Sequence, residues 1–182
     1  AGRDTIVVSK GALVHSGPKL RALARSSGAM LKLSGAAAAA LPTIDLLEHS
    51  LKGSAVLEIE GIVNATTNYL LDAMMNLNLG LEDALARARA GGFAEADPRN
   101  DIEGWDTASK LILIANFGLD ADLTMDDVVV EGIGSVGASD IETWRRQGLV
   151  PKLVGSLTHA DGTMRAGVGI RTYPLSDPLA HV

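Results

Sequence analysis

The residues that lead up to Lys110 carry the strongest chemical signal in this sequence. They read Gly92-Phe-Ala-Glu-Ala-Asp-Pro-Arg-Asn-Asp-Ile-Glu-Gly-Trp-Asp-Thr-Ala-Ser-Lys110, a run rich in carboxylates, and an apolar segment at 111–115 follows directly. Because that segment is hydrophobic on every face, we expect a helix that is buried all round. A lysine at the edge of a buried helix needs a polar partner.

Carboxylates at helical spacing precede this lysine. Asp106 stands four residues before Lys110 and Glu103 seven before it, so the spacing predicts that all three lie on one face of a helix. A lysine held by a carboxylate can donate a proton in chemistry near neutral pH. The same spacing is also typical of a simple salt bridge on a partly exposed helix, and the spacing alone leaves both interpretations open.

The elements that must position these groups follow from hydrophobic periodicity. We expect a buried strand over Thr5–Ser9, a helix over Pro18–Ser26 closed by Gly28, and a strand over Ala29–Leu33. The alanine run after Gly35 fits either a helix start or a turn. The remaining pattern predicts helices over 44–51, from Asn64 or Thr66 through 75, over 81–90, over 103–117 and from Ser139 through 147, and strands over 55–63 and 126–132.

Two further segments, Val150–Thr158 and Met164–Tyr173, are joined by Ala160-Asp-Gly and predict a β-hairpin. The sequence contains no internal repeat and no obvious linker. The predicted fold class is therefore α/β, or α+β-like, with a mixed sheet covered on one face by helices.

Composition excludes several classes of function. A net charge of −6 and the lack of a Lys/Arg cluster argue against a nucleic-acid partner. Without cysteine there are no disulfides, zinc–thiolate sites or thiol nucleophiles. The first ten residues are not typical of a secretory signal, and no run has the length of a membrane span. We therefore expect a soluble cytoplasmic protein with no membrane partner.

Other candidate motifs are weak. The histidines lack zinc-ligand spacing, and no serine stands in Gly-x-Ser-x-Gly. Asp97, Asp101 and Glu103 could ligate calcium or magnesium, but a solvated acidic turn is favoured, so we expect no metal site. The run Gly132-Ile-Gly-Ser-Val-Gly137 matches the dinucleotide-binding pattern. We interpret it as a chance turn, because Ser139 is expected to cap the next helix beyond the loop and no parallel strand ending in an acidic residue follows.

Two long segments, in the right order, resemble a known family. Gly61-Ile-Val-Asn-Ala-Thr-Thr-Asn-Tyr-Leu-Leu71 resembles a signature of homoserine dehydrogenases, and the run that ends on Lys110 resembles their second signature. Val8-Ser-Lys10-Gly-Ala-Leu also resembles the point where the family's dinucleotide domain meets its catalytic domain. The resemblance extends from about Val7 to the last residue.

The resemblance implies an organisation and a function. Residues 1–10 would end a missing dinucleotide-binding domain, and residues 11–182 would form a catalytic and dimerisation domain that is truncated at its C-terminus. The implied activity interconverts L-aspartate 4-semialdehyde and L-homoserine with NADP or NAD, which is bound mostly by the missing domain. The implied partners are a small-molecule substrate and a second copy of the chain in a homodimer.

The resemblance also implies roles for individual residues. Lys110 matches the family's acid/base, and Asp106 matches the aspartate that holds substrate and lysine in place. The residues that match substrate-binding positions are Glu95, Asp101 and Thr66. The residues that match cofactor-binding positions are Lys10 and Gly92.

The sequence departs from the family at a stretch that supplies a monovalent cation site. The family commonly reads Glu-Ala-x-Val-Gly-Gly-Gly-Ile-Pro, whereas this chain reads Ser34-Gly-Ala-Ala-Ala-Ala-Ala-Leu-Pro42. Because Ser34 replaces the carboxylate and alanines replace flexible glycines, we expect no ordered cation. Ala65 also replaces a glycine, and Phe93 replaces a tyrosine. These departures leave open a diverged oxidoreductase acting on another small substrate, or a fragment that acts mainly in dimerisation.

Overall fold

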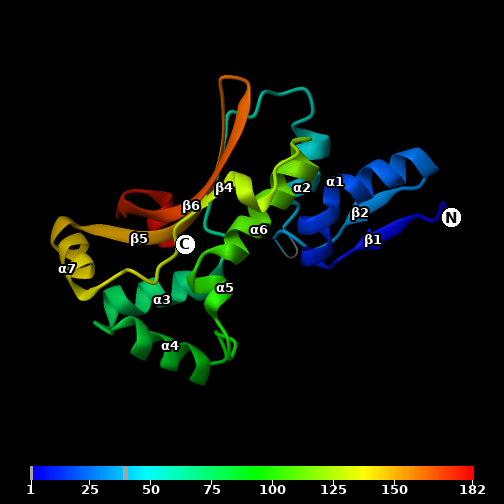
Figure 1. Cartoon of the computed structure of the whole chain (residues 1–182). Coiled ribbons are helices and arrows are strands. Elements are labelled where there is room, and N and C mark those ends of the chain that lie inside the picture. Colours follow the sequence, from blue (N-terminus) through cyan, green and yellow to red (C-terminus); the bar gives the residue numbers. More distant parts are fainter. Residues whose placement is uncertain (1, 39–40) are drawn as a thin grey trace. The chain divides into compact units, whose positions relative to one another are not determined.

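A computed structural model of the chain describes residues 2–38 and 41–182, which form a mixed α/β fold (Figure 1). In chain order its strands and α-helices are β1 (Thr5–Val7), α1 (Lys10–Ser27), β2 (Leu31–Leu33), α2 (Thr43–Asp45), β3 (Glu58–Gly61), α3 (Ala65–Asn76), α4 (Leu81–Ala90), α5 (Arg99–Ile102), α6 (Trp105–Leu113), β4 (Val128–Val130), α7 (Ala138–Gln147), β5 (Leu149–Ala160) and β6 (Thr163–Pro174). π-Helical turns follow α2 at Leu46–Ser50 and α6 at Ile114–Gly118, and 3-10 turns lie at Met125–Asp127 and Pro178–His181. The predicted fold class is confirmed.

The chain divides into two compact units. The first contains Ala1–Ile59, Ala108–Val128 and Leu157–Ala166. The second contains Glu60–Thr107, Val129–Ser156 and Gly167–Val182.

The first unit begins with a β1-α1-β2 segment. β1 pairs in parallel with β2, with Thr5 opposite Leu31. Helix α1 ends at Gly28, which adopts φ +68° and donates its N–H to the last turn of the helix, as predicted. The expected burial of the first strand was wrong, since Ile6 is 71% exposed. The helix also begins earlier than predicted, because Pro18 lies inside α1 and does not mark its first turn.

A second part of the first unit forms around the buried end of α6. The apolar segment that follows Lys110 is buried on all sides, as predicted, with Ile112 and Leu113 fully inaccessible to solvent. Helix α1 approaches the π-helical turn after α6 closely at Gly17, where a Cβ atom would lie 2.8 Å from Phe117 Cε2. Residues 36–38 of the alanine run form a turn, and α2 starts after Pro42. Ala39 and Ala40 lie outside the described residues.

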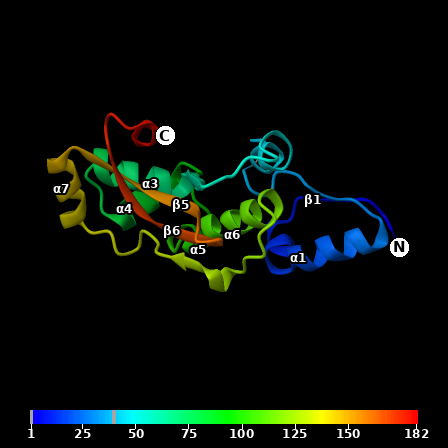
Figure 2. The same ribbon diagram turned by 90° about the horizontal axis from the view of Figure 1, so that it is seen from above.

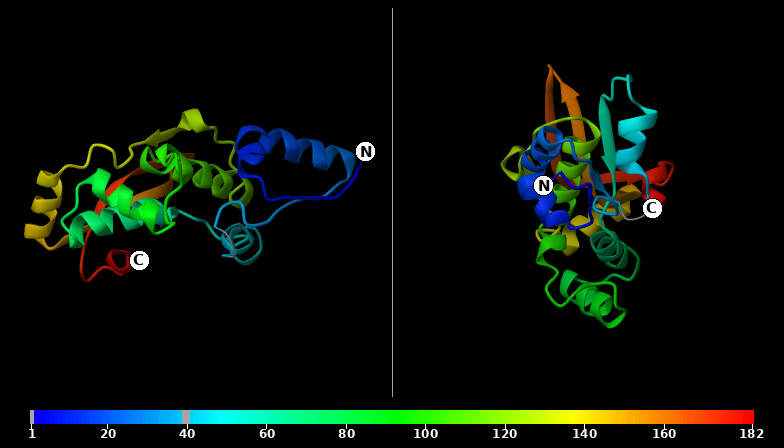
Figure 3. Two further views of the ribbon diagram at one scale, coloured as in Figure 1. Left: turned by 90° about the horizontal axis from the view of Figure 1, so that it is seen from below. Right: turned by 90° about the vertical axis from the view of Figure 1, so that its right-hand side faces the viewer.

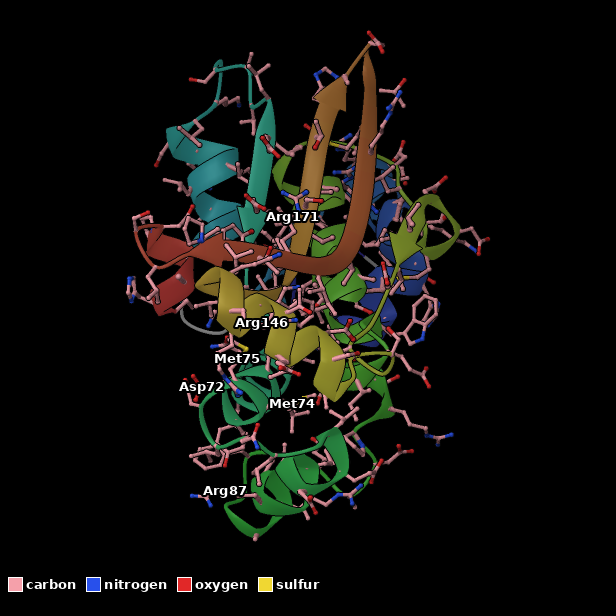
Figure 4. All side chains as sticks on the ribbon, turned by 90° about the vertical axis from the view of Figure 1, so that its left-hand side faces the viewer. Asp72, Met74, Met75, Arg87, Arg146 and Arg171 are labelled. Carbon is pink, nitrogen blue, oxygen red and sulfur yellow. The ribbon has the colours of Figure 1, made fainter. Side chains whose placement is uncertain are left out.

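Helices dominate the second unit. Helix α3 packs against α4, α5 and α7, and the views in Figures 2 and 3 show α4 alongside α3. Figure 4, which labels Met74 and Met75, shows α7 next to this end of α3. Met74 is 1% exposed, so the contact is part of the core. Helix α4 has the predicted bounds and ends at Gly91.

A buried lysine attaches α3 to the sheet of the second unit. Lys152 on β5 is 4% exposed, and its ammonium group donates to Asn68 Oδ1 at 2.7 Å and to the carbonyl oxygen of Val182 at 2.6 Å. Burial lowers the pKa of this lysine, and the nearby Asp72 carboxylate opposes that shift. These bonds link α3 to β5 and to the last residue of the chain.

The larger sheet has the strand order β3-β5-β6-β4 and does not include the β1–β2 pair, so the single sheet expected from the sequence is two sheets within the described residues. The predicted hairpin is confirmed as β5 and β6. Asp161 and Gly162 form its turn with φ of +53° and +74°. Positive φ at both positions is the geometry of a type I′ turn, which Asp-Gly favours.

The loop that matches the dinucleotide-binding pattern has a structural explanation. A Cβ atom on Gly132 would overlap the carbonyl oxygen of Ile102, and Ile133 N donates to that oxygen at 2.8 Å. The prediction that Ser139 caps the next helix was wrong, because Gly137 is the N-cap of α7. The Gly137 N–H donates to the Asp140 carboxylate at 2.9 Å, whereas in a dinucleotide-binding loop this N–H would donate to a phosphate. The first glycine therefore allows close backbone packing. This packing and the bonded N–H of Gly137, in place of a cap at Ser139, support the interpretation of the loop as a turn.

Candidate active site

Asn64, at the start of α3, lies at the centre of the candidate site in the second unit. It is the N-cap of the helix, with extended backbone and a side-chain oxygen that accepts the N–H of Thr67 at 2.8 Å. The Thr67 hydroxyl lies 3.0 Å from the same oxygen. Asn64 is 5% exposed and Thr67 is fully buried, so the cap belongs to the interior.

The amide nitrogen of Asn64 connects two carboxylates from different helices. Its Nδ2 donates to Asp101 Oδ1 on α5 at 2.6 Å and to Asp106 Oδ2 on α6 at 2.9 Å. Both carboxylates are half-buried. Two negative groups that share one neutral donor form a site that attracts a cation, for example an ammonium group.

The other end of the site is formed by Thr66 and the segment after α4. The Thr66 hydroxyl donates to the carbonyl oxygen of Phe93 at 3.2 Å. The Phe93 ring stacks on Tyr69, with the ring centroids 5.0 Å apart. Gly92, immediately before Phe93, adopts φ +75°, and the space around its Cα is open. The structure thus brings Thr66, Gly92, Asp101 and Asp106 into one region of the second unit.

The remaining acidic residues of this segment differ in their environments. Glu95 is exposed. Asp97 is also exposed, and hydrogen bonds from Arg99 lower its pKa from 3.8 to about 2. The prediction that Glu103 shares a helix face with Lys110 was wrong. Gly104, with φ +88°, separates α5 from α6, and Glu103 instead accepts a hydrogen bond from the Trp105 indole at 3.0 Å.

The two candidate lysines belong to the first unit. Lys10 is the first residue of α1 and is half-buried. Lys110 is also half-buried and lies on α6, four residues after Asp106, as the sequence predicted. Each of these lysines has an interaction partner in the structure.

Three side chains of types that can ligate a metal gather in the first unit, and none of them belongs to the acidic segment considered in the sequence. In the described part of the chain, Asp45, Glu48 and His49 place ligand atoms within 4.8 Å of one another. All three side chains are exposed, and Glu48 also lies 3.8 Å from the ammonium group of Lys32. We assign no metal to this group. The predicted lack of a cation at the alanine run depends partly on residues outside the described ones and stays a prediction.

Comparison with known proteins decides the family. The homoserine dehydrogenase family model matches residues 42–182, which include every residue of the second unit described above. The chain belongs to the homoserine dehydrogenase family.

Individual relatives agree with this assignment. The chain is 38% identical over its full length to an NAD(+)-dependent homoserine dehydrogenase of Pseudomonas canavaninivorans, of which it covers 51%. It is 39% identical over 99% of its length to a homoserine dehydrogenase of Mycobacterium leprae, of which it covers 41%. A solved homoserine dehydrogenase from Thiobacillus denitrificans superposes on 98% of the chain with a TM-score of 0.93 at 27% identity, and 42% of that protein is covered. The chain thus spans about half the length of the curated relatives it matches.

The hydrogen bonds of the Asn64 amide nitrogen were not predicted from the sequence. Asn64 and Thr66 were the two predicted caps of α3, and the structure confirms Asn64. The bonds to Asp101 and Asp106 join residues far apart in the chain, and no local pattern predicts them. Within residues 2–38 and 41–182, no helix combines the length and the apolar character needed to cross a membrane.

Proposed function

We propose that the protein containing this chain interconverts L-homoserine and L-aspartate 4-semialdehyde with NAD or NADP. The observation that carries the proposal is the pair of carboxylates tethered by Asn64, built from the two segments that resemble the family's signatures. A carboxylate pair suits the ammonium group that both amino acids carry.

In the proposed reaction, homoserine loses its hydroxyl proton and a hydride from the carbon that bears the hydroxyl. The nicotinamide accepts the hydride when it is bound. Lys110 holds and exchanges the proton at the substrate oxygen, and Asp106, one helical turn earlier on α6, orients the lysine and the substrate. The balanced products are the aldehyde, the reduced nicotinamide and one proton.

Substrate binding is assigned to Glu95, Asp101 and Thr66. Exposed Glu95 is accessible to a ligand, and half-buried Asp101 is held by Asn64. Thr66, in the first turn of α3, already uses its hydroxyl to fix the Phe93 carbonyl, so its contribution is to shape the site.

Cofactor binding is assigned to Lys10 and Gly92. Gly92 fits a backbone contact, because a ligand can approach its Cα closely. The loop at Gly132–Gly137 does not fit the pyrophosphate, so we propose that a domain outside these 182 residues binds most of the dinucleotide. Residues 1–10 would connect to that domain, and residues 11–182 would form the catalytic part. We also propose a homodimer, and a monomer in sedimentation experiments would contradict that part.

The test compares two alcohols in the full-length enzyme with NAD⁺ and with NADP⁺. L-Homoserine carries the ammonium group, whereas 4-hydroxybutyrate has the same chain without it. We expect reduction of the nicotinamide with homoserine and a kcat/KM at least about a hundredfold lower with 4-hydroxybutyrate, because the carboxylates would then have no cation to bind. Equal rates would favour the diverged oxidoreductase. Inactivity with both would contradict the proposed function.

A further inference from the structure

The side chain of Asn64 does more than cap α3. Resting on the function proposed above, we propose that Asn64 is a positioning residue, whose amide sets the separation of Asp101 and Asp106 and so determines how the substrate ammonium is bound. Asp101 lies on α5 and Asp106 on α6, so neither carboxylate is held near Asn64 by closeness in the sequence. The amide is the group that joins them.

The hydrogen-bond pattern fixes the orientation of this amide. The backbone N–H of Thr67 can only donate, so the atom facing it must be the side-chain oxygen of Asn64. The NH₂ group then faces the two carboxylates, which can only accept when ionised. A flipped amide would oppose donor to donor and acceptor to acceptor. Because the residue is 5% exposed, water cannot replace these bonds easily.

The joint between α5 and α6 explains why such a clamp is useful. Gly104 lies between the helices with φ +88°, so the path from Asp101 to Asp106 is not one rigid helix. Two neighbouring carboxylates repel each other, and the repulsion grows as water is excluded. Two N–H donors on one neutral group hold both in place without neutralising them. The amide itself contributes no charge that would compete with an ammonium ligand.

Two substitutions separate the cap from the clamp. Serine and aspartate are about as good at the N-cap as asparagine, so α3 keeps its first-turn acceptor in N64S and N64D. Serine has one hydrogen to donate, and aspartate places a third carboxylate beside the other two. The matched control is N76S, because Asn76 lies on the same helix but is exposed and donates to Asp72, at 2.7 Å, and not to the candidate site.

The kinetic experiment uses the full-length enzyme. We expect the KM for L-homoserine to rise about tenfold or more in N64S and further in N64D, with the KM for the nicotinamide cofactor unchanged. N64S should melt at a lower temperature than the wild-type protein, because the half-buried Asp101 and Asp106 carboxylates lose a hydrogen-bond donor. N76S should be indistinguishable from wild type in both KM and melting temperature. A homoserine KM within about threefold of wild type in N64S and N64D would overturn the proposal, whether or not their stability falls.

A structural readout does not depend on activity. In crystal structures of wild-type and N64S protein, we expect at least one of the Asp101 and Asp106 carboxylates to turn away from its wild-type position. Carboxylates that stay in place in N64S would overturn the positioning role. A wild-type enzyme without homoserine activity would instead contradict only the proposed function, and the crystal comparison would still decide the role of Asn64.

Discussion

Replacing Gly132 by alanine should destabilise the protein more than any other glycine substitution in the loop Gly132–Gly137. An ideal Cβ atom at this position lies 2.6 Å from Glu103 Cα and 2.7 Å from the Glu103 carbonyl carbon, and it overlaps the carbonyl oxygen of Ile102. These are backbone atoms, so no side-chain rotation relieves the clash. The two chain segments must separate instead.

The cost follows from two contributions. Overpacking of a well-packed site typically costs about 1–3 kcal/mol. Separation also breaks the bond from Ile133 N to the Ile102 carbonyl, which measures 2.8 Å beside a fully buried side chain, and a hydrogen bond contributes about 1 kcal/mol. We therefore expect G132A to lower the free energy of unfolding by about 2–4 kcal/mol, or the melting temperature by about 4–16 °C.

The assay is thermal and urea unfolding of the 182-residue chain, with G134A as the matched control. A Cβ on Gly134 would lie 3.8 Å from Ile102 Cγ2, an ordinary contact, so G134A should change stability by no more than about 0.5 kcal/mol. In a phosphate-binding loop, the second glycine is the one that a pyrophosphate approaches. G134A would then weaken cofactor binding more than G132A. If G132A were as stable as wild type, the packing explanation of this loop would be refuted.

Two smaller perturbations test neighbouring features. T67V removes a buried hydroxyl that contacts Asn64 and should lower the free energy of unfolding by about 1–2 kcal/mol. T107V should be neutral or stabilising by up to about 1 kcal/mol, because among the described residues the buried Thr107 hydroxyl has no hydrogen-bond partner. Urea unfolding that ranks the two variants in the reverse order would contradict this. R99Q should return the pKa of Asp97 from about 2 towards 3.8, as measured by NMR titration of its carboxyl group. Because the folded-state pKa is depressed, this ion pair contributes stability above pH 3.8 and loses it as the pH falls to about 2; an unchanged pKa in R99Q would exclude the guanidinium as the cause.

Local sequence signals predicted the elements wherever one strong residue type decided the geometry. Gly28 ended α1, Asp161-Gly162 formed the hairpin turn, and the apolar run after Lys110 became a buried helix. Predictions of helix bounds were wrong where a tertiary contact, which the local sequence does not show, influences the structure. Helical spacing predicted a helix from Pro18 onward, yet α1 begins at Lys10 and continues through the proline. Its neighbour Gly17 lies close to Phe117.

The candidate site was predictable in its residues but not in its connections. Family resemblance pointed to Asp101 and Asp106, and periodicity placed Lys110 one turn after Asp106. Glu103 was assigned to the helix of Lys110, whereas it lies in the turn before α6, because the positive φ of Gly104 was not anticipated. A glycine inside a helical pattern weakens the prediction of a continuous helix. The clamp by Asn64 joins segments that no periodic pattern relates, so only the structure could reveal it.

The most direct test of the proposed chemistry is the rate of homoserine oxidation by full-length K110M enzyme. Methionine keeps the length and apolar stem of the lysine but cannot exchange a proton. We expect kcat to fall by about two to four orders of magnitude, the usual contribution of a general acid or base, while cofactor affinity stays within about threefold of wild type. A K110M enzyme that turns over within about threefold of wild type would contradict the account and leave Lys110 as a salt-bridge partner of Asp106.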